Sequence, residues 1–472
     1  MMRMVLVGLA LGTAGLAADL SSSVTFSKDV LPILQKNCQS CHRPGQVAPM
    51  SLISFKDTRP WAKAIKAAVI GKKMPPWFAD PKYGHFINDR SLTQSEIDTL
   101  AKWADTGVLE GDAKDAPAPI DWPKGGWEIQ PDIVMDLPPH DVPAKGVLEW
   151  ELMALPAPFN SDTWLTSLEI LPGEASVVHH ICFSFVKHKP STVYNRYEWV
   201  AVPRDASGNP TAGNSGLGEL PDMHTATRDV GSTEIKIRPG APTLRANNDF
   251  CYLPGNSVDD YRPWKAGKLV PAGSDIIMSL HYTTNGKAVV DRTKIGFTVA
   301  KTPPLKKFVM QQAGEDTPVI APTEASSRAK FSSAYNPTFA IPPNDGDYRA
   351  PPMDITFLKD VEMVRLRPHA HVRGKSTQYT MTYPDGRDEV VLNVPHYDFN
   401  WQVAYGVSMK LPKGTRLHFE FHYDNSVNNK NNPDSSRWVY QGFQSWEEMM
   451  VPNLGFILDR DADVSGLMSV QN

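Results

Sequence analysis

The chain has few cysteines, no excess of positive charge and no long apolar run. Four cysteines in 472 residues exclude a dense disulfide framework. Lys and Arg together number 48 against 52 Asp and Glu, so nothing in the balance indicates a nucleic-acid or anionic-membrane surface. No stretch reaches the roughly 20 apolar residues of a transmembrane helix. These absences leave a globular protein, and 41 prolines with 32 glycines favour short strands joined by turns.

The first 18 residues are typical of a secretory signal peptide. Arg3 supplies the positive charge, residues 5–16 are apolar or small, and Gly15-Leu16-Ala17 offers small residues for cleavage. The apolar segment meets Asp19 too early for a membrane anchor. We therefore expect a periplasmic or secreted protein with no membrane anchor.

Two of the cysteines stand in the run Cys38-Gln39-Ser40-Cys41-His42. C-x-x-C-H is the attachment sequence of a c-type haem, in which two thiols bond to the porphyrin edge and the adjacent imidazole ligates the iron. A redox dithiol or half of a zinc site would need a thioredoxin-like context or a second C-x-x-C, and the sequence has neither. The run therefore predicts a covalent haem c held by Cys38, Cys41 and His42, and export agrees with it.

Helical periodicity surrounds this motif. Apolar residues recur every three to four positions over 26–37, 60–69 and 93–106, and Gly107 follows the last segment. Helices before and after C-x-x-C-H are the plan of a class I cytochrome c, which we predict over residues 24–112.

Met74 is the expected sixth ligand of the haem iron. It lies far enough beyond His42 for the chain to wrap around a haem. Met50 is too near to His42 to reach the opposite haem face, and His85 is the weaker alternative. The competing interpretation of Met74 is an ordinary core methionine.

After an Ala- and Pro-rich linker at 113–126, the periodicity changes to two. Residues 131–135, 164–170, 276–281 and 361–366 all alternate as strands do. About 340 residues of this pattern are too many for one sandwich. A break near Thr302-Pro303-Pro304 divides them into 127–302 and 303–472. The predicted fold is thus a small all-α cytochrome c domain followed by two all-β antiparallel sandwich (jelly-roll-like) domains.

The remaining cysteines, Cys182 and Cys251, lie among strand-like residues. In an oxidising compartment they could form a disulfide, but the sequence does not show that they meet. Two buried thiols are the equal alternative.

Two histidine pairs stand out in the β region. His369 and His371 are two residues apart, so on a strand both imidazoles face one side and can meet one metal. His179 and His180 face opposite sides of a regular strand, so they could share a metal only at a strand end or a distortion. His281 is the expected third ligand of that pair. Each pair taken alone also fits surface or core histidines.

A thioether or another imidazole could complete the second pair. Met449 precedes the final predicted strand at 454–458, and His422 is its competitor.

The order and spacing of these motifs resemble those of a known enzyme family. Val178-His179-His180, His281-Tyr282, the run from Arg367 to Lys375 and Glu448-Met449 look like the copper type II, ascorbate-dependent monooxygenases, which include the peptidylglycine α-hydroxylating and dopamine β-hydroxylating enzymes. The resemblance covers about 130–465. It implies an electron-accepting copper and an oxygen-activating copper, held respectively by His179, His180 and His281 and by His369, His371 and Met449.

The resemblance also implies a substrate contact and a closer branch. Arg367 stands where the peptide hydroxylase has an arginine that anchors the substrate carboxylate; the alternative is a solvated arginine at a strand end. The animal enzymes have many disulfides and lack an N-terminal cytochrome. An exported bacterial branch with a preceding cytochrome is the nearer comparison, and its Met-Pro-Pro-Trp motif is present as Met74-Pro75-Pro76-Trp77.

Together these features predict an exported haem–copper monooxygenase. It would hydroxylate a C–H bond of a small-molecule or peptide substrate with O₂, and the haem, fed by a redox donor, would take the place of ascorbate. One alternative is a non-enzymatic multicentre electron-transfer or copper-binding protein. Another is that the histidines are structural and only the haem is active.

Overall fold

A computed structural model gives the structure of the chain. It describes residues 23–146, 148, 151–188, 190, 192, 194, 196–201, 227–230, 233–236, 249–312, 340–440 and 445–471. The predicted signal peptide lies outside the described residues. Strands make up 38% of the chain and helices 14%, so the fold is mostly β. Among the described residues, no helix has the length and apolarity needed to cross a membrane.

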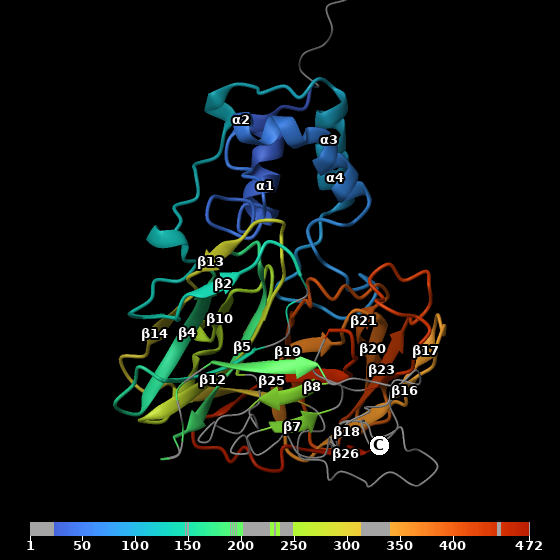
Figure 1. The fold of residues 1–472 in the computed structure, drawn as a ribbon. Coiled ribbons are helices and arrows are strands. Elements are labelled where there is room, and N and C mark those ends of the chain that lie inside the picture. The colour runs from blue at the N-terminus through green and yellow to red at the C-terminus, as the bar shows by residue number, and fades with distance from the viewer. Residues whose placement is uncertain are drawn as a thin grey trace, which may run out of the picture. The chain divides into compact units, whose positions relative to one another are not determined.

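The chain forms two compact units. Figure 1 colours their elements by residue number. Unit 1 comprises Met1–Ser40, Ser51–Pro75 and Leu92–Ile120. Unit 2 comprises Cys41–Met50, Pro76–Ser91 and Asp121–Asn472. Residues 41–50 and 76–91, which the sequence places in a helical domain, thus group with the β region.

Unit 1 contains the predicted helices. Its elements are η2 (Phe26–Val30), α1 (Leu31–Asn37), α2 (Phe55–Thr58), η3 (Arg59–Trp61), α3 (Ala62–Ile70), α4 (Gln94–Asp105) and η4 (Ala113–Asp115). The first turn of the 26–37 segment is a π-helix rather than an α-helix. Thr93 and Glu96 form a capping box that starts α4, as the hydroxyl and acidic residues there predict. Val30, Leu34 and Trp103 are buried in this unit.

Contacts within unit 2 explain why residues 76–91 belong to it. The amide of Asp80 donates to the carbonyl of Asn393, and the side chain of Asn88 donates to the carbonyl of Ala404. The ring of Trp77 lies 5.0 Å from that of Tyr405, centroid to centroid. Backbone bonds and aromatic packing therefore fasten this segment to the β region.

Three large sheets build the rest of unit 2. The nine-stranded sheet contains β1 (Ile133–Asp136), β14 (Lys294–Val299), β4 (Thr163–Leu171), β11 (Ala266–Val270), β15 (Lys306–Gln312), β25 (Val451–Asp459), β19 (Val361–His369) and β22 (Tyr405–Leu411), with β10 (Val258–Asp260) beside β4. The seven-stranded sheet contains β7 (Thr227–Val230), β8 (Thr233–Lys236), β6 (Arg196–Ala201), β3 (Glu151–Pro156), β12 (Ser274–Tyr282), β5 (Val178–Lys187) and β9 (Phe250–Tyr252).

The six-stranded sheet contains β21 (Asp388–Val394), β20 (Gly374–Thr382), β23 (Arg416–Tyr423), β18 (Met353–Phe357) and β26 (Met468–Gln471), with β17 (Tyr348–Arg349) beside β23. Two short pairs join β13 (Val289–Asp291) to β2 (His140–Val142) and β16 (Ala340–Ile341) to β24 (Val439–Tyr440). The 3₁₀ turns η5 (Lys124–Gly126) and η6 (Arg262–Trp264) complete the elements. The predicted strands at 164–170, 276–281 and 361–366 are confirmed as β4, β12 and β19.

Two hydrophobic cores lie between these sheets. One joins residues of β4 and β14 to β5 and β12, such as Leu168 and Ile181. The other joins β19 and β25 to β20 and β23, such as Phe456 and Phe419. Two antiparallel β-sandwich cores thus agree with the predicted fold class. The nine-stranded sheet runs through both halves, because β15 pairs in parallel with β11 and antiparallel with β25.

The two cysteines outside the haem motif form a disulfide. Cys182 on β5 and Cys251 on β9 are direct cross-strand partners, and their sulfurs are bonded. The structure therefore decides between the two alternatives that the sequence left open.

Glu169 on β4 gives a prediction about stability. Its side chain is fully buried, and its Oε2 accepts the amide N–H groups of Glu128 and Ile129. Burial is the largest cause that raises its pKa from 4.5 to about 7. A raised pKa in the folded state adds stability at low pH that is lost as the pH rises through about 7.

Glu169→Gln should remove this dependence. Between pH 5 and 8, the free energy of unfolding of the wild type should fall by about 3 kcal/mol relative to the variant. Urea unfolding of both proteins at the two pH values measures the difference. If the free energies of unfolding of the two proteins change in parallel with pH, the raised pKa assigned to Glu169 is contradicted.

Candidate metal centres

A distortion between β5 and β12 brings three histidines together. His180 pairs with His281 across the two strands, but the next pair is Val178 with Tyr282, so the register skips His179. One extra residue on one strand is a β-bulge, which changes the direction in which the bulged side chain points. The consecutive histidines therefore do not diverge as they would on a regular strand. This is the kind of distortion that the sequence required.

The geometry of this group, the histidine triad, suits a metal ion. His179, His180 and His281 each offer one ring nitrogen, and these atoms lie within 4.8 Å of one another. The Nδ1 atoms of His179 and His180 are 3.2 Å apart. Two ligands at about 2.0 Å from one tetrahedral metal stand roughly 3.3 Å apart. The same spacing also fits a hydrogen bond, and a metal ion would replace the shared proton.

Burial keeps these imidazoles neutral. It lowers the pKa of His179 to about 4 and that of His281 to about 3. Burial is also the main cause that lowers the pKa of His180, and the nearby His281 lowers it further. The Nε2 atom of His179 is buried and receives no hydrogen bond from the described residues. Neutral imidazoles with a buried, unused lone pair are the state in which histidine binds metals.

The second pair lies where β19 ends. The rings of His369 and His371 are 5.1 Å apart, centroid to centroid, so they share a side as their two-residue spacing predicts. The Nδ1 of His369 lies 2.6 Å from Oε1 of Gln402, and the Nδ1 of His371 lies 3.2 Å from the carbonyl oxygen of Glu447. Metal-binding imidazoles commonly donate one ring N–H to such an oxygen and bind through the other nitrogen.

Electrostatics within the second pair resemble those of the triad. Burial lowers the pKa of His369 to about 4 and also lowers that of His371. Charges on His281 and His179 contribute to the shift at His371. The two histidine groups therefore lie close enough to influence each other.

Backbone pairing brings Met449 towards His371. Val451, the first residue of β25, pairs with His369, the last residue of β19, so Met449 and His371 each lie two residues beyond this last antiparallel pair. The carboxylate of Glu448 joins the two ends. Its Oε2 accepts the amide N–H of His371 at 2.7 Å and that of Met449 at 3.3 Å.

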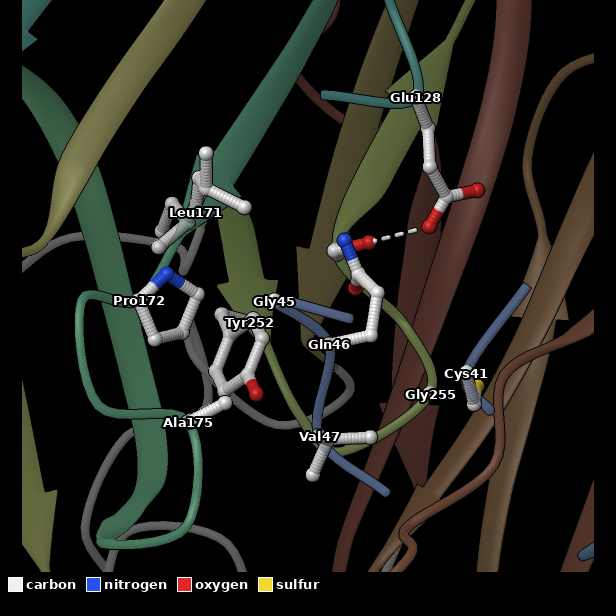
Figure 2. A pocket seen from close by; sticks show the side chains of 12 residues that line it. Cys41, Gly45, Gln46, Val47, Glu128, Leu171, Pro172, Ala175, Tyr252 and Gly255 are labelled. Carbon is white, nitrogen blue, oxygen red and sulfur yellow. Dashed lines mark hydrogen bonds between the residues drawn. The ribbon is translucent and has the colours of Figure 1, made fainter. Parts of the chain in front are cut away.

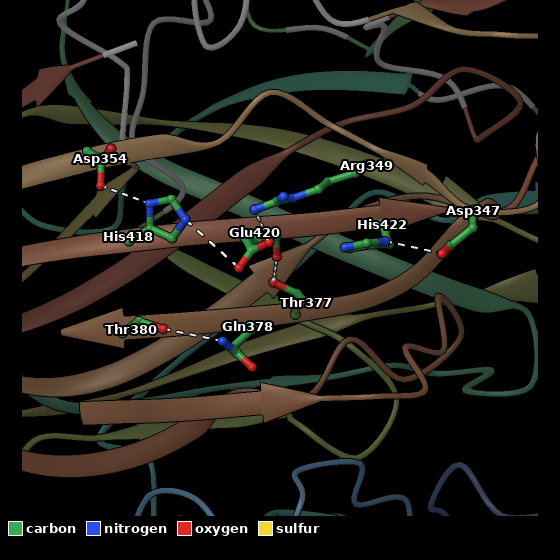
Figure 3. Close-up of polar contacts among 9 residues, drawn as sticks. All are labelled: Asp347, Arg349, Asp354, Thr377, Gln378, Thr380, His418, Glu420 and His422. Atoms are coloured by element: carbon green, nitrogen blue, oxygen red, sulfur yellow. Dashed lines mark hydrogen bonds and ion pairs between the residues drawn. The ribbon is translucent and has the colours of Figure 1, made fainter. Parts of the chain in front are cut away.

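His422 lies on the other face of its strand. Its Nδ1 is 3.2 Å from a carboxylate oxygen of Asp347, in the group of polar contacts that Figure 3 shows. Adjacent residues of a strand face opposite sides. The next residue, Tyr423, donates its hydroxyl to the carbonyl of Met449. The geometry therefore favours Met449 over His422 as the third ligand.

Arg367 is buried within β19. Its side chain is 5% exposed, so the alternative of a solvated strand-end arginine is wrong. The neighbouring Arg365 makes a hydrogen bond and an ion pair to the carboxylate of Asp259, and both charges act on the buried guanidinium of Arg367. A buried cation of this kind favours an anionic partner.

The residues of the haem motif belong to different units. Cys38 and Met74 lie in unit 1, and Cys41, His42 and His85 lie in unit 2. Cys38 and Cys41 are not part of the disulfide. The Nδ1 of His42 lies 3.2 Å from the carbonyl oxygen of Met50, so Nε2 is the ring nitrogen that would bind a metal. The sixth iron ligand, Met74 or His85, stays a prediction.

A small pocket opens beside Cys41 in unit 2 (Figure 2). Gly45, Gln46 and Val47 line one part of it, and Leu171, Pro172 and Tyr252 line another. The side chain of Ser257 donates to the carboxylate of Glu128 at its edge. The cysteine next to His42 therefore lines this pocket.

The segment 397–402, between β21 and β22, has contacts that the sequence did not reveal. The hydroxyl of Tyr397 donates to the carbonyl of Ala370 and accepts its amide N–H. The ring of Phe399 lies 4.5 Å from that of His179 and 5.6 Å from that of His371. Gln402 bonds His369 from a backbone with φ of 41°, a region that disfavours residues other than glycine. No periodic pattern marks these residues.

Comparisons with known proteins assign the chain to no family. No protein-family model and no curated protein matches it. Solved structures that match include one titled "Structure of infectious bursal disease virus Gx strain", at 8% sequence identity and a TM-score of 0.16, covering 72% of this chain and 76% of that chain. A TM-score this low carries no argument about fold or function.

Proposed function

We propose that the chain is an exported haem–copper monooxygenase that uses O₂ to hydroxylate a C–H bond. Residues 24–112 would belong to a cytochrome c, with the haem c attached through Cys38 and Cys41, and two coppers would bind in residues 127–472. The copper ions and haem, when bound, would supply one-electron transfer and oxygen activation. The observation that carries the proposal is the buried histidine triad formed at the β-bulge.

The two histidine groups differ in the way that the proposal requires. The triad offers imidazoles alone, which serve both copper oxidation states. The second group offers His369, His371 and the thioether of Met449, a softer set that favours Cu(I), the form that reacts with O₂. Three ligands leave a coordination position open, as catalysis at a metal needs.

Strand pairing supports an electron route from the haem motif to the triad. Tyr252 on β9 lines the pocket beside Cys41. It pairs with Ile181 on β5, the residue directly after His180. Three neighbouring residues thus link the pocket to the first histidine group.

Arg367 supports an anionic group in the substrate. Its buried guanidinium lies two residues before His369 on the same strand. A carboxylate bound there would be held by charge-assisted hydrogen bonds close to the second histidine group. The substrate would then be a small molecule or peptide that carries a carboxylate.

Oxygen uptake tests the proposal. Protein matured with haem and copper, supplied with a one-electron donor, should consume O₂ in proportion to hydroxylated product, and His369→Ala should abolish this. Carboxylate-bearing peptides and small acids are the substrates to screen. Reversible oxidation and reduction of both metals, with no substrate-dependent uptake across the screen, would favour an electron-transfer protein instead.

Glu448 should control the second copper alone. Glu448→Gln removes the carboxylate that accepts the amides of His371 and Met449, so the ligands lose their support. Replacing such supporting groups typically weakens metal binding by about 10–100-fold. Copper titration should show this loss in a His179→Ala background, where only the second site remains. Glu420→Gln on β23, a partly buried carboxylate paired with Arg349, is the control, and equal weakening in both variants would refute the assignment.

A further inference from the structure

Phe399 is in ring contact with both histidine groups. Its centroid lies 4.5 Å from that of His179, with the rings tilted by 32°, and 5.6 Å from that of His371, in an edge-on arrangement. The side chain is 8% exposed. One aromatic ring therefore fills the space between a histidine of the triad and a histidine of the second pair.

Neighbouring residues hold that ring in place. Tyr397 makes two hydrogen bonds to the backbone of Ala370, between the two histidines of the second pair. Gln402 binds the ring of His369. Tyr397 thus contacts Ala370, Phe399 contacts His371, and Gln402 contacts His369. The segment is fixed on both sides of Phe399.

We propose that Phe399 is a positioning residue shared by the two metal sites. This inference rests on the proposed function. The ring fixes the orientations of His179 and His371, sets the distance between the sites and keeps water out of the space between them. With copper bound, the triad would supply a one-electron donor and the second group a one-electron acceptor, and the ring of Phe399 would lie between the histidines that hold them.

The shared role sets Phe399 apart from its neighbours. In the part of the chain that the structure describes, the side-chain hydrogen bonds of Tyr397 and Gln402 go to Ala370 and His369, in the segment of the second pair. Phe399 contacts one histidine of each group. A change at 399 should therefore disturb two metal sites, whereas a change at 402 should disturb one.

Copper EPR spectroscopy in single-site backgrounds tests the proposal. His369→Ala leaves the triad, and His179→Ala leaves the second site, and each is loaded with one Cu(II). Phe399→Ala should shift the copper spectrum and weaken binding about 10–100-fold in both backgrounds. Gln402→Ala should do so only in the His179→Ala background. Phe399→Tyr, which keeps the ring, should restore both spectra, and Phe399→Leu serves if the alanine variant does not fold.

Electron transfer is measured in the otherwise unchanged protein. After rapid reduction of the haem, the rate at which the second copper is reduced should fall at least about tenfold in Phe399→Leu and recover in Phe399→Tyr. A wild type that binds two coppers while Phe399→Leu and Phe399→Ala leave either spectrum unchanged refutes this inference alone. A wild type that binds no copper refutes the proposed function, and this inference with it.

Discussion

Replacement of His281 by alanine is expected to reduce the copper content from two ions per chain to one. His281 supplies one of the three clustered ring nitrogens, and the other two come from neighbouring residues on the paired strand. Without His281, the triad keeps only two imidazoles, one ligand fewer than the three that would hold the first copper. The second site keeps its own ligands, so one copper should remain. Elemental analysis after dialysis against a mild chelator measures both outcomes.

His418→Ala is the matched control for this change. His418 is a partly exposed histidine on β23 whose Nδ1 is 2.9 Å from a carboxylate oxygen of Asp354 (Figure 3). Its removal should leave both coppers in place. Retention of two coppers in His281→Ala, with the control also unchanged, would rule out the triad as a metal site.

Removal of the two motif cysteines should abolish covalent haem attachment. In Cys38→Ala/Cys41→Ala no thiol remains in the motif to form a thioether, so no haem should stay with the chain on a denaturing gel. Both copper sites lie in residues 121–472 and should be retained. Haem staining together with copper analysis measures the two effects.

The disulfide cysteines provide the control for the haem prediction. Cys182→Ser should keep covalent haem, because Cys182 is bonded to Cys251 instead. It should lose about 4 kcal/mol of unfolding free energy, the loop-closure value for the 69 residues between the two cysteines. Covalent haem that survives in the Cys38→Ala/Cys41→Ala variant would refute the attachment site.

Local sequence patterns were sufficient for many of the elements. α4 follows from a capping box and apolar residues at helical spacing, both of which act within a few residues. β12 and β19 follow from runs of strand-forming residues that are buried in the structure. The closeness of His369 and His371 agrees with their two-residue spacing, although β19 ends at His369 and His371 follows it.

Long-range features were beyond local patterns. From the sequence, His179 and His180 could share a site only at a strand end or at a distortion of the strand. The bulge that supplies the distortion depends on how β12 pairs with β5, which local patterns do not reveal. The disulfide likewise depends on pairing between β5 and β9. Residues 76–91 make hydrogen bonds to residues more than 300 positions away in the sequence. The helical pattern near them therefore could not predict that they belong to unit 2.

The supporting residues of the site were the hardest to predict. Phe399 and Gln402 act through contacts with histidines brought near by the folded sheets. A phenylalanine and a glutamine in a loop have no spacing that distinguishes them from surface residues. The sequence also left open whether the side chain of Arg367 is buried or exposed, because burial of a strand-end arginine depends on the sheet that covers it.

The most direct measurement of the account is the iron and copper content of the chain after maturation with haem. One iron and two coppers per chain are expected, with one copper lost in His369→Ala and the iron unchanged. One iron with no copper in the folded protein would contradict the account, because the histidines would then be structural and only the haem would remain for electron transfer.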